Sequence, residues 1–371
     1  MEKADCLTGT IPGGIVLKEP GRGMGKRRRF VFEDRASCYH VMSRVAGGDL
    51  LFGDVEKEAF RKLMRRMERF SGVEILTYVM MGNHFHLLVR VPERAKGLAK
   101  FSTGCREVRE QRLMSHLKLL YSKAYLEQLD RELRVMEQKG LDELYEKTMQ
   151  GYLDRMFSLE RFMKELKERF SRWFNKRHER KGTLWQERYR SILVQDGEAL
   201  RTIAAYIDLN PLRAGLVDDP KDYRWCGYAE AVAGSKRARI GICRALGVAM
   251  DSWEKVGHRA YRRLLLVDGM MGPEGEMGGG KQKKKPPGFN REAALKKLKD
   301  GEPLSRSELL RCKVRYFSEG LVLGGWEFVE SAFRARRHWF GKRGKGGAHA
   351  LPDEEGGLFT LRNLLKSQSL E

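Results

Sequence analysis

The chain has 371 residues, with 72 Lys and Arg against 50 Asp and Glu, so its formal charge is +22 and its pI about 9.8. This excess of positive charge indicates a polyanionic partner, nucleic acid first of all. The chain shows no run of 18 or more apolar residues and no signal-peptide core, which argues against a membrane protein or an exported one. Its six cysteines form no CxxC pair, which argues against a zinc ribbon or a disulfide framework. We expect a cytoplasmic, nucleoid-associated protein.

The N-terminal part of the chain predicts a strand, a helix and a hairpin after a flexible basic leader over residues 1–29. Alternation of apolar and polar residues predicts the strands, and an apolar stripe among charges predicts the helix. The Gly82-Asn83 dipeptide fits a tight turn because both residues tolerate positive φ. The predicted elements are a strand over Cys38–Val45, a helix over Val55–Phe70, and strands in "VEILTYVMM" and "HFHLLVRV" on either side of that turn.

The next part alternates helices with one strand. Leucines spaced among charges over residues 101–156 predict a helical insertion. From Ser158, a predicted N-cap, a long helix keeps one apolar face, a strand follows over Arg188–Val194, and a helix capped by Asp196 covers Gly197–Leu209. Strands separated by helices predict an α+β sheet domain made of residues 30–100 and 157–235.

The C-terminal part is less regular. We expect a short helical extension over 236–268, a linker over 269–288, rich in Gly, Pro and Lys, and a small helical region over 289–371. In that last region, Ser305 and Glu308 form a capping box and Trp326–Arg337 predicts a helix, as in a helix-turn-helix-like module.

His84 and His86 stand one residue apart at the head of an apolar run, "GNHFHLLVRV". Side chains alternate along a strand, so both imidazoles point to one face while Phe85 enters the opposite layer. Two imidazoles on one face can share a divalent cation. The alternative is a chance pair on an exposed strand face, and the spacing does not choose between them.

The surrounding motifs resemble those of a known family. "MMGNHFHLLVRVPE" resembles the His-hydrophobic-His strand of the HUH single-strand nucleases, and "RKGTLWQERYRSILV" with "YIDLNPLRAGLV" resembles segments of the REP-associated tyrosine transposases and related single-tyrosine insertion-sequence transposases. The resemblance implies a ferredoxin-like antiparallel sheet with packed helices. It further implies that the histidines bind Mg²⁺ or Mn²⁺ and that Tyr206 attacks single-stranded DNA, giving a 5′-phosphotyrosine and a 3′-OH that can rejoin the strand. The implied targets are palindromic repeats that fold into hairpins, bound by a monomer or a homodimer.

Tyr206 and Asn210 are the candidate nucleophile and third metal ligand. A phosphodiester resists attack because it is anionic, so a bound cation that neutralises it lowers the barrier. Asn210 lies four residues after Tyr206, on the same helical face, where its carbonyl oxygen could complete the coordination. The alternatives are a core tyrosine beside Ile203, and an asparagine that ends its helix before Pro211.

A basic cluster around residues 172–190 is the candidate DNA surface. Cations neutralise phosphates, and the ring of Trp185 could stack on an unpaired base, unless it belongs to the core and the charges form a solvated face. Arg213 could reach a phosphate or form a structural ion pair. The charged residues of the cluster are Arg172, Lys176, Arg177, Arg180, Lys181, Arg188 and Arg190.

These observations predict a metal-dependent tyrosine transposase, that is, a single-strand DNA endonuclease with strand-transfer activity. A hairpin-binding or regulatory protein that has lost catalysis is the alternative, and a basic surface supports it equally. An RNA-binding protein is a third class, because positive charge alone does not separate RNA from DNA.

Overall fold

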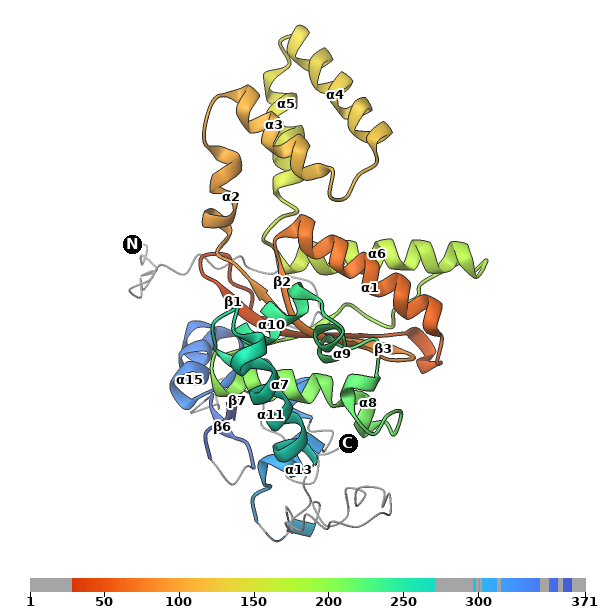
Figure 1. Cartoon of the computed structure of the whole chain (residues 1–371). Coiled ribbons are helices and arrows are strands. Elements are labelled where there is room, and N and C mark those ends of the chain that lie inside the picture. Colours follow the sequence, from red (N-terminus) through yellow and green to blue (C-terminus); the bar gives the residue numbers. More distant parts are fainter. Residues whose placement is uncertain are drawn as a thin grey trace, which may run out of the picture.

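The computed structural model describes residues 29–270, 296–297, 300, 302–311, 315–340, 347–352 and 356–361. Residues 1–28 of the predicted leader lie outside these ranges. So do residues 271–288 of the predicted linker. A seven-stranded sheet of order β2-β3-β1-β4-β5-β7-β6 runs through the molecule (Figure 1). Its strands are β1 (Ser37–Arg44), β2 (Glu74–Met80), β3 (His84–Val91), β4 (Arg190–Val194), β5 (Val322–Gly324), β6 (His349–Ala350) and β7 (Phe359–Thr360).

The first four strands form an antiparallel core with β1 at its centre, paired to β3 on one side and to β4 on the other. Helix α1 (Asp54–Ser71) joins β1 to β2, and α6 (Leu159–Arg177) precedes β4; the two helices pack on each other and cover one face (Figure 1). Strand order and connections are those of a ferredoxin-like fold, which confirms the predicted α+β class. The helix predicted from Ser158 begins as expected, because the hydroxyl of Ser158 accepts a hydrogen bond from the backbone N–H of Arg161.

Alternation along β3 divides the interior into two cores. Phe85 and Leu87 belong to the core beneath α1 and α6, whereas Leu88 belongs to the core on the opposite face. His84 and His86 share the face of Leu88, as the period of two requires. The face of the sheet opposite α1 and α6 therefore carries the candidate site.

Helices from the middle of the chain cover that second face. Helix α7 (Glu198–Asp208) packs on β2 and β3, and α10 approaches β2 so closely that a Cβ on Gly241 would lie 2.5 Å from the carbonyl oxygen of Leu76. The predicted cap of α7 is wrong, since Gly197 occupies the N-cap position and the carboxylate of Asp196 accepts a bond from the Cys38 thiol instead. The remaining helices here are α8 (Asn210–Arg213), η2 (Pro220–Asp222), α9 (Gly227–Val232), α10 (Lys236–Leu246), η3 (Trp253–Gly257) and α11 (His258–Met270).

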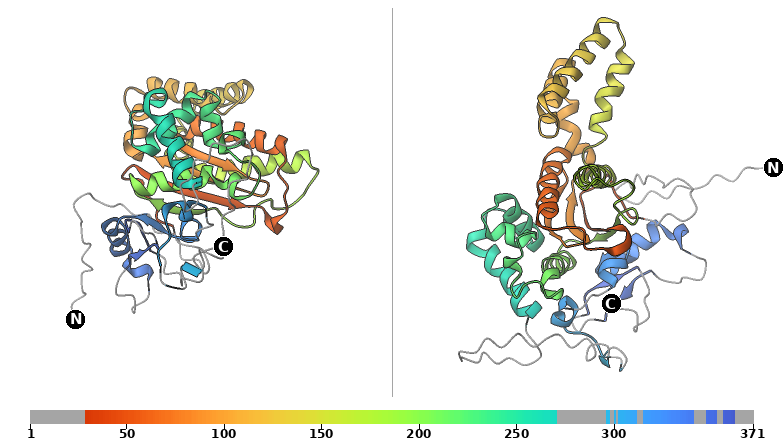
Figure 2. Two further views of the ribbon diagram at one scale, coloured as in Figure 1. Left: turned by 60° about the horizontal axis from the view of Figure 1, so that its bottom comes forward. Right: turned by 90° about the vertical axis from the view of Figure 1, so that its right-hand side faces the viewer.

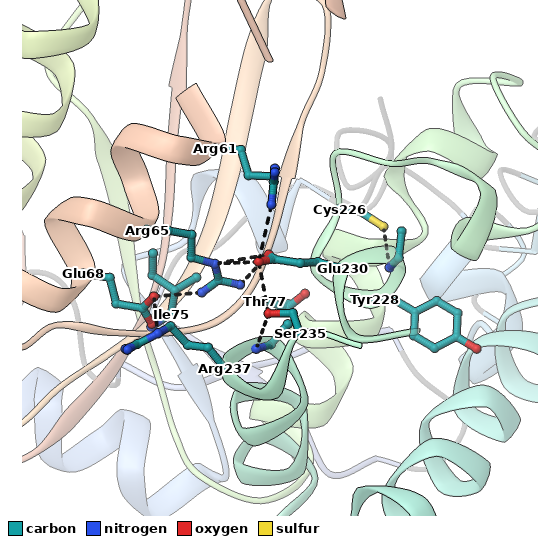
Figure 3. A network of polar contacts seen from close by, with 12 residues as sticks. Arg61, Arg65, Glu68, Ile75, Thr77, Cys226, Tyr228, Glu230, Ser235 and Arg237 are labelled. Carbon is teal, nitrogen blue, oxygen red and sulfur yellow. Dashed lines mark hydrogen bonds and ion pairs between the residues drawn. The ribbon is translucent and has the colours of Figure 1, made fainter. Parts of the chain in front are cut away.

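A buried ion-pair network fastens α9 to α1 (Figure 3). The guanidinium of Arg65 donates to Glu230 at 2.6 Å and to Glu68 at 2.9 Å, and Ser235 also bonds Glu230. Glu68 in turn accepts from the backbone N–H of Ile75 at 2.8 Å. Because each buried charge has a partner, the network holds the second layer of helices in a fixed position on the sheet edge.

The predicted insertion is helical and projects from the body of the molecule (Figures 1 and 2). Leu126, Leu129 and Leu133 form the buried stripe of its longest helix. Helix α2 (Arg94–Ser102) leads into it from β3 and begins before the predicted bound of 101. The helices within the predicted range are α3 (Arg106–Leu117), α4 (Lys123–Gln138) and α5 (Asp142–Leu153).

The C-terminal region does not form a separate helical module as predicted. Strand β5 pairs in parallel with β4, and β7 and β6 extend the sheet beyond it. The predicted capping box is present, since the side chain of Glu308 accepts from the Ser305 N–H and the Ser305 hydroxyl accepts from the Glu308 N–H. Helical elements in this region are α13 (Arg306–Arg311), α14 (Tyr316–Glu319), α15 (Trp326–Ala335) and η4 (Arg337–Trp339). At the other end of the described chain, the short helix η1 (Ala46–Gly48) follows β1. None of the described helices is long and apolar enough to cross a membrane.

Candidate active site on the open face of β3

Strand β3 presents both histidines to one cavity of about 400 Å³. The ring centroids of His84 and His86 lie 5.2 Å apart, and Tyr206 and Asn210 line the same cavity. Helix α7 brings Tyr206 there because it crosses β2 and β3 on this face of the sheet. The structure thus brings together all four residues that the sequence proposed for the metal and the nucleophile.

Tyr206 is largely enclosed by protein, with 4% of its surface exposed. Its ring centroid lies 6.5 Å from that of His86 and 5.1 Å from that of Phe317 in α14. The guanidinium of Arg213 stacks 4.0 Å above the ring and donates hydrogen bonds to the carbonyl oxygens of Tyr206 and Leu310. Arg213 therefore contacts the proposed nucleophile through both its ring and its backbone carbonyl.

A third histidine, His40, contacts His86 from the neighbouring strand. Nε2 of His40, on β1, lies 2.9 Å from Nδ1 of His86. Complete burial lowers the pKa of His40 to about 3, and burial together with the neighbouring His40, His84 and Arg213 lowers the pKa of His86 well below its usual value. Both rings are neutral near pH 7, which is the form that ligates a metal ion.

These residues fit a divalent cation. Nδ1 of His84 lies 2.7 Å from Oδ1 of Asn83, and Nδ1 of His86 is engaged by His40, so both rings would coordinate through Nε2. No three His, Cys, Asp or Glu side chains among the described residues form a metal-binding group, so the set depends on an amide oxygen as third ligand. Asn210, 8% exposed, opens α8 after α7 has ended at Asp208. Asn210 thus lies just past the end of α7 and lines the cavity.

Asp208 anchors the helix that carries Tyr206. Its carboxylate accepts bonds from the Thr77 hydroxyl at 2.7 Å, the Tyr261 hydroxyl at 2.5 Å and the backbone N–H of Tyr228 at 3.1 Å. Complete burial raises the pKa of Asp208 to about 6, although these donors oppose the rise. Residues of β2, α9 and α11 thus all bond the side chain of Asp208. Asp208 lies two residues after Tyr206, so these bonds fix the position of the end of α7 that carries the proposed nucleophile.

The predicted DNA-binding residues fall into two groups. Arg188, Arg190 and Arg213 line the cavity. The other predicted cations, Arg172, Lys176, Arg177, Arg180 and Lys181, lie exposed at or just beyond the C-terminal end of α6, on the far side of the sheet. Of that second group, Arg172 pairs with Glu168 and Arg177 with Glu56. Only the first group meets the histidines and Tyr206.

Trp185 is a core residue, which favours the second of the two alternatives that the sequence left open over a stacking platform. It is 7% exposed, its ring packs against Phe52, Phe85 and Phe170, and its indole N–H donates to the carbonyl of Lys167. The ring and its polar atom are thus mainly engaged by protein, and only a small exposed part lines the cavity beside α6.

Residues 153–210 match the family model described as "Transposase IS200 like". This segment of the chain is similar to the IS200-like transposases. This segment holds α6, β4, α7 and Tyr206, and it ends at Asn210. No curated protein matches the chain. A solved structure described as "Structure of the REP associates tyrosine transposase bound to a REP hairpin" is similar at 13% identity with a TM-score of 0.32, over 57% of this chain and 87% of that one. The fold assignment rests on the strand order and connections themselves.

The sequence did not predict His40 and Phe317 as neighbours of the candidate site. His40 lies in the predicted strand "CYHVMSRV", on the face of Cys38 and Met42. Alternation alone could have placed it on the site face, but its contact with His86 depends on the pairing of β1 with β3. Phe317 belongs to α14, for which no motif in the sequence predicted a position at the site.

Proposed function

We propose that this protein is a metal-dependent single-strand DNA transposase that cleaves and rejoins DNA through a 5′-phosphotyrosine intermediate. The observation that carries the proposal is the shared cavity of His84, His86, Tyr206 and Asn210, drawn from a strand and a helix far apart in the chain. A tyrosine beside two imidazoles and an amide is the arrangement that this chemistry requires.

In the proposed reaction the Tyr206 hydroxyl gives up its proton as its oxygen attacks phosphorus, and the bond from phosphorus to the 3′ oxygen breaks. The departing oxygen takes up a proton to become a 3′-OH, and the phosphate stays attached to Tyr206. Arg213, 4.0 Å above the ring, stabilises negative charge that develops on the phenolic oxygen. A cation held by His84, His86 and Asn210 would supply neutralisation of the phosphate charge.

Rejoining is the same exchange in reverse. A 3′-OH attacks the phosphotyrosine, the strand is restored and Tyr206 regains its proton. The bond energy is kept in the phosphotyrosine, so the exchange needs no ATP. Transfer to a different 3′-OH would amount to strand transfer.

Single-stranded DNA hairpins are the proposed substrate class, bound by a monomer or homodimer. The transposase segment and the charge of +22 support a DNA substrate, and Arg188 and Arg190 place two cations at the cavity wall. A cavity of about 400 Å³ admits a nucleotide and a cation but no duplex. Specificity for a hairpin would then come from its shape and its unpaired flanks.

A hairpin-binding protein without catalysis is the second candidate function. The enclosure of Tyr206 by Phe317 and Arg213 favours it, since a nucleophile with 4% of its surface exposed must be uncovered before it reacts. Both candidates predict hairpin binding, and only the first predicts a covalent adduct.

Incubation with single-stranded hairpin oligonucleotides and Mn²⁺, followed by a denaturing gel, separates the two. A transposase leaves a protein-DNA band that survives denaturation, whereas a binding protein leaves none across hairpins of many sequences. Matched RNA hairpins in parallel test the substrate class, and an adduct formed on RNA alone would contradict the proposal.

A further inference from the structure

A second, larger cavity adjoins the catalytic one. It measures about 790 Å³ and lies between α6 and the segment 183–189. Glu187 and Arg188 belong to the walls of both cavities, so the two are neighbours across these residues. We call it the α6 groove. A polymer chain that leaves the catalytic cavity past Arg188 enters this groove directly.

Three cations from α6 line the α6 groove. Arg161, Lys164 and Lys167 are three residues apart, so they follow one side of the helix over about 9 Å. Arg161 and Lys164 are exposed, whereas Lys167 is partly buried. Nζ of Lys167 donates one hydrogen bond, to the carbonyl oxygen of Glu187 at 2.7 Å. An ammonium group has three donors, so Lys167 can bind a ligand while it keeps its hydrogen bond to Glu187, which lies between the two cavities.

Most carboxylates that line the α6 groove form ion pairs, whereas its three α6 cations form none with any described residue. Its acidic side chains at 154, 160, 168 and 187 each pair with an arginine: Asp154 with Arg94 at 3.0 Å, Glu160 with Arg188 at 4.0 Å, Glu168 with Arg172 at 3.4 Å and Glu187 with Arg190 at 2.8 Å.

By contrast, Arg161, Lys164 and Lys167 pair with no carboxylate within 4.0 Å in the described part of the chain. The groove is lined by five carboxylates and five cations, and of the carboxylates Glu33 alone has no described ion pair. Among the lining side chains without a described ion pair, three cations therefore face one carboxylate. Burial lowers the pKa of Lys167 to about 8, and a bound anion would offset that cost. A row of unmatched cations in a groove favours a phosphate ligand.

We propose that the α6 groove is a phosphate-binding subsite for the single DNA strand that flanks the cleavage point, with Arg161, Lys164 and Lys167 as its ligands. The inference rests on the proposed function, because the strand must first occupy the catalytic cavity. It assigns the unpaired flank of a hairpin substrate to the α6 groove and the scissile phosphate to the cavity of Tyr206.

The test compares Arg161→Gln/Lys164→Gln with a control that removes the same charge elsewhere, Lys139→Gln/Lys147→Gln in the insertion. All four side chains are exposed, so neither double variant disturbs a core. Binding is measured by fluorescence anisotropy, at several salt concentrations, on a hairpin without flanks and on hairpins with a single-stranded flank on the 5′ or the 3′ side.

The groove variant is expected to bind one of the flanked hairpins roughly threefold to tenfold more weakly than wild type, with the logarithmic salt slope reduced by about 1.4 for two lost phosphate contacts. Its affinity for the hairpin without flanks should match that of the control. Equal losses on all three hairpins, or no loss on either flanked one, would overturn the inference. If wild type itself binds no hairpin and forms no adduct, the proposed function fails, which is a distinct outcome.

Discussion

Nε2 of His40 and Nδ1 of His86 lie 2.9 Å apart on the neighbouring strands β1 and β3. One of these two nitrogens must carry the hydrogen. If His86 donates through Nδ1, its Nε2 keeps a lone pair, and only this tautomer can bind a cation in the cavity. His40 is thus positioned to select the metal-binding tautomer and the ring orientation of His86.

Replacement of His40 by Leu should weaken Mn²⁺ binding by roughly 10-fold to 100-fold, the usual cost of losing a residue that orients a metal-ligating histidine. Isothermal titration with Mn²⁺ measures this without any catalytic readout. His178→Leu, beyond the end of α6, is the matched histidine control. An affinity equal to that of wild type would remove His40 from the positioning role.

His84→Ala should abolish Mn²⁺-dependent cleavage, because a ligand to the metal is lost. Hairpin affinity should stay within about twofold of wild type, because the phosphate contacts of the α6 groove are unchanged. Asn83→Ala should cause a smaller loss, because Oδ1 of Asn83 only orients the ring of His84, at 2.7 Å from Nδ1. Single-turnover cleavage rates provide the comparison. Full activity of the His84 variant would contradict the ligand assignment.

The carboxyl of Asp208 should make stability depend on pH. Its folded pKa of about 6 lies above the ordinary value of 3.8, so its stabilising contribution is full below about pH 4 and is lost as the pH rises through 6. Asp208→Asn removes this titration. The difference in unfolding free energy between wild type and variant should change by on the order of 3 kcal/mol between pH 4 and 6.5 and stay constant above. Urea unfolding at several pH values measures it, and a flat difference throughout would contradict the raised pKa.

Trp185→Ala should destabilise the fold by about 3–5 kcal/mol, because it removes a buried ring packed between Phe52, Phe85 and Phe170. Trp185→Phe keeps most of the packing and should cost less. Denaturant unfolding distinguishes this from a role in DNA binding: near-native stability of the Ala variant combined with weaker hairpin affinity would restore the stacking role.

Much of the fold could be predicted because local patterns determine it. Alternation placed His84 and His86 on one face whatever the rest of the chain does, since a strand has a period of two. The apolar stripe from Leu159 to Trp173 predicted α6 for the same kind of reason.

What could not be predicted depends on tertiary pairing. The contact between His40 and His86 follows from the register that pairs Met42 with His86, and no local pattern encodes a register. Strands β5, β6 and β7 have three, two and two residues, too short to show a period, so the C-terminal region looked entirely helical. A tryptophan among cations gives the same pattern in a core and at a DNA surface, and only the burial of Trp185 distinguishes the two.

The attachment point of DNA on the protein tests the proposed mechanism most directly. Wild-type protein and Tyr206→Phe are incubated with the same hairpin and Mn²⁺, digested with trypsin and nuclease, and examined by mass spectrometry. The predicted result is a nucleotide on the tryptic peptide that contains Tyr206, absent from the variant, while hairpin affinity is unchanged. An adduct on another residue, or one that persists in Tyr206→Phe, would contradict the assignment of Tyr206 as nucleophile.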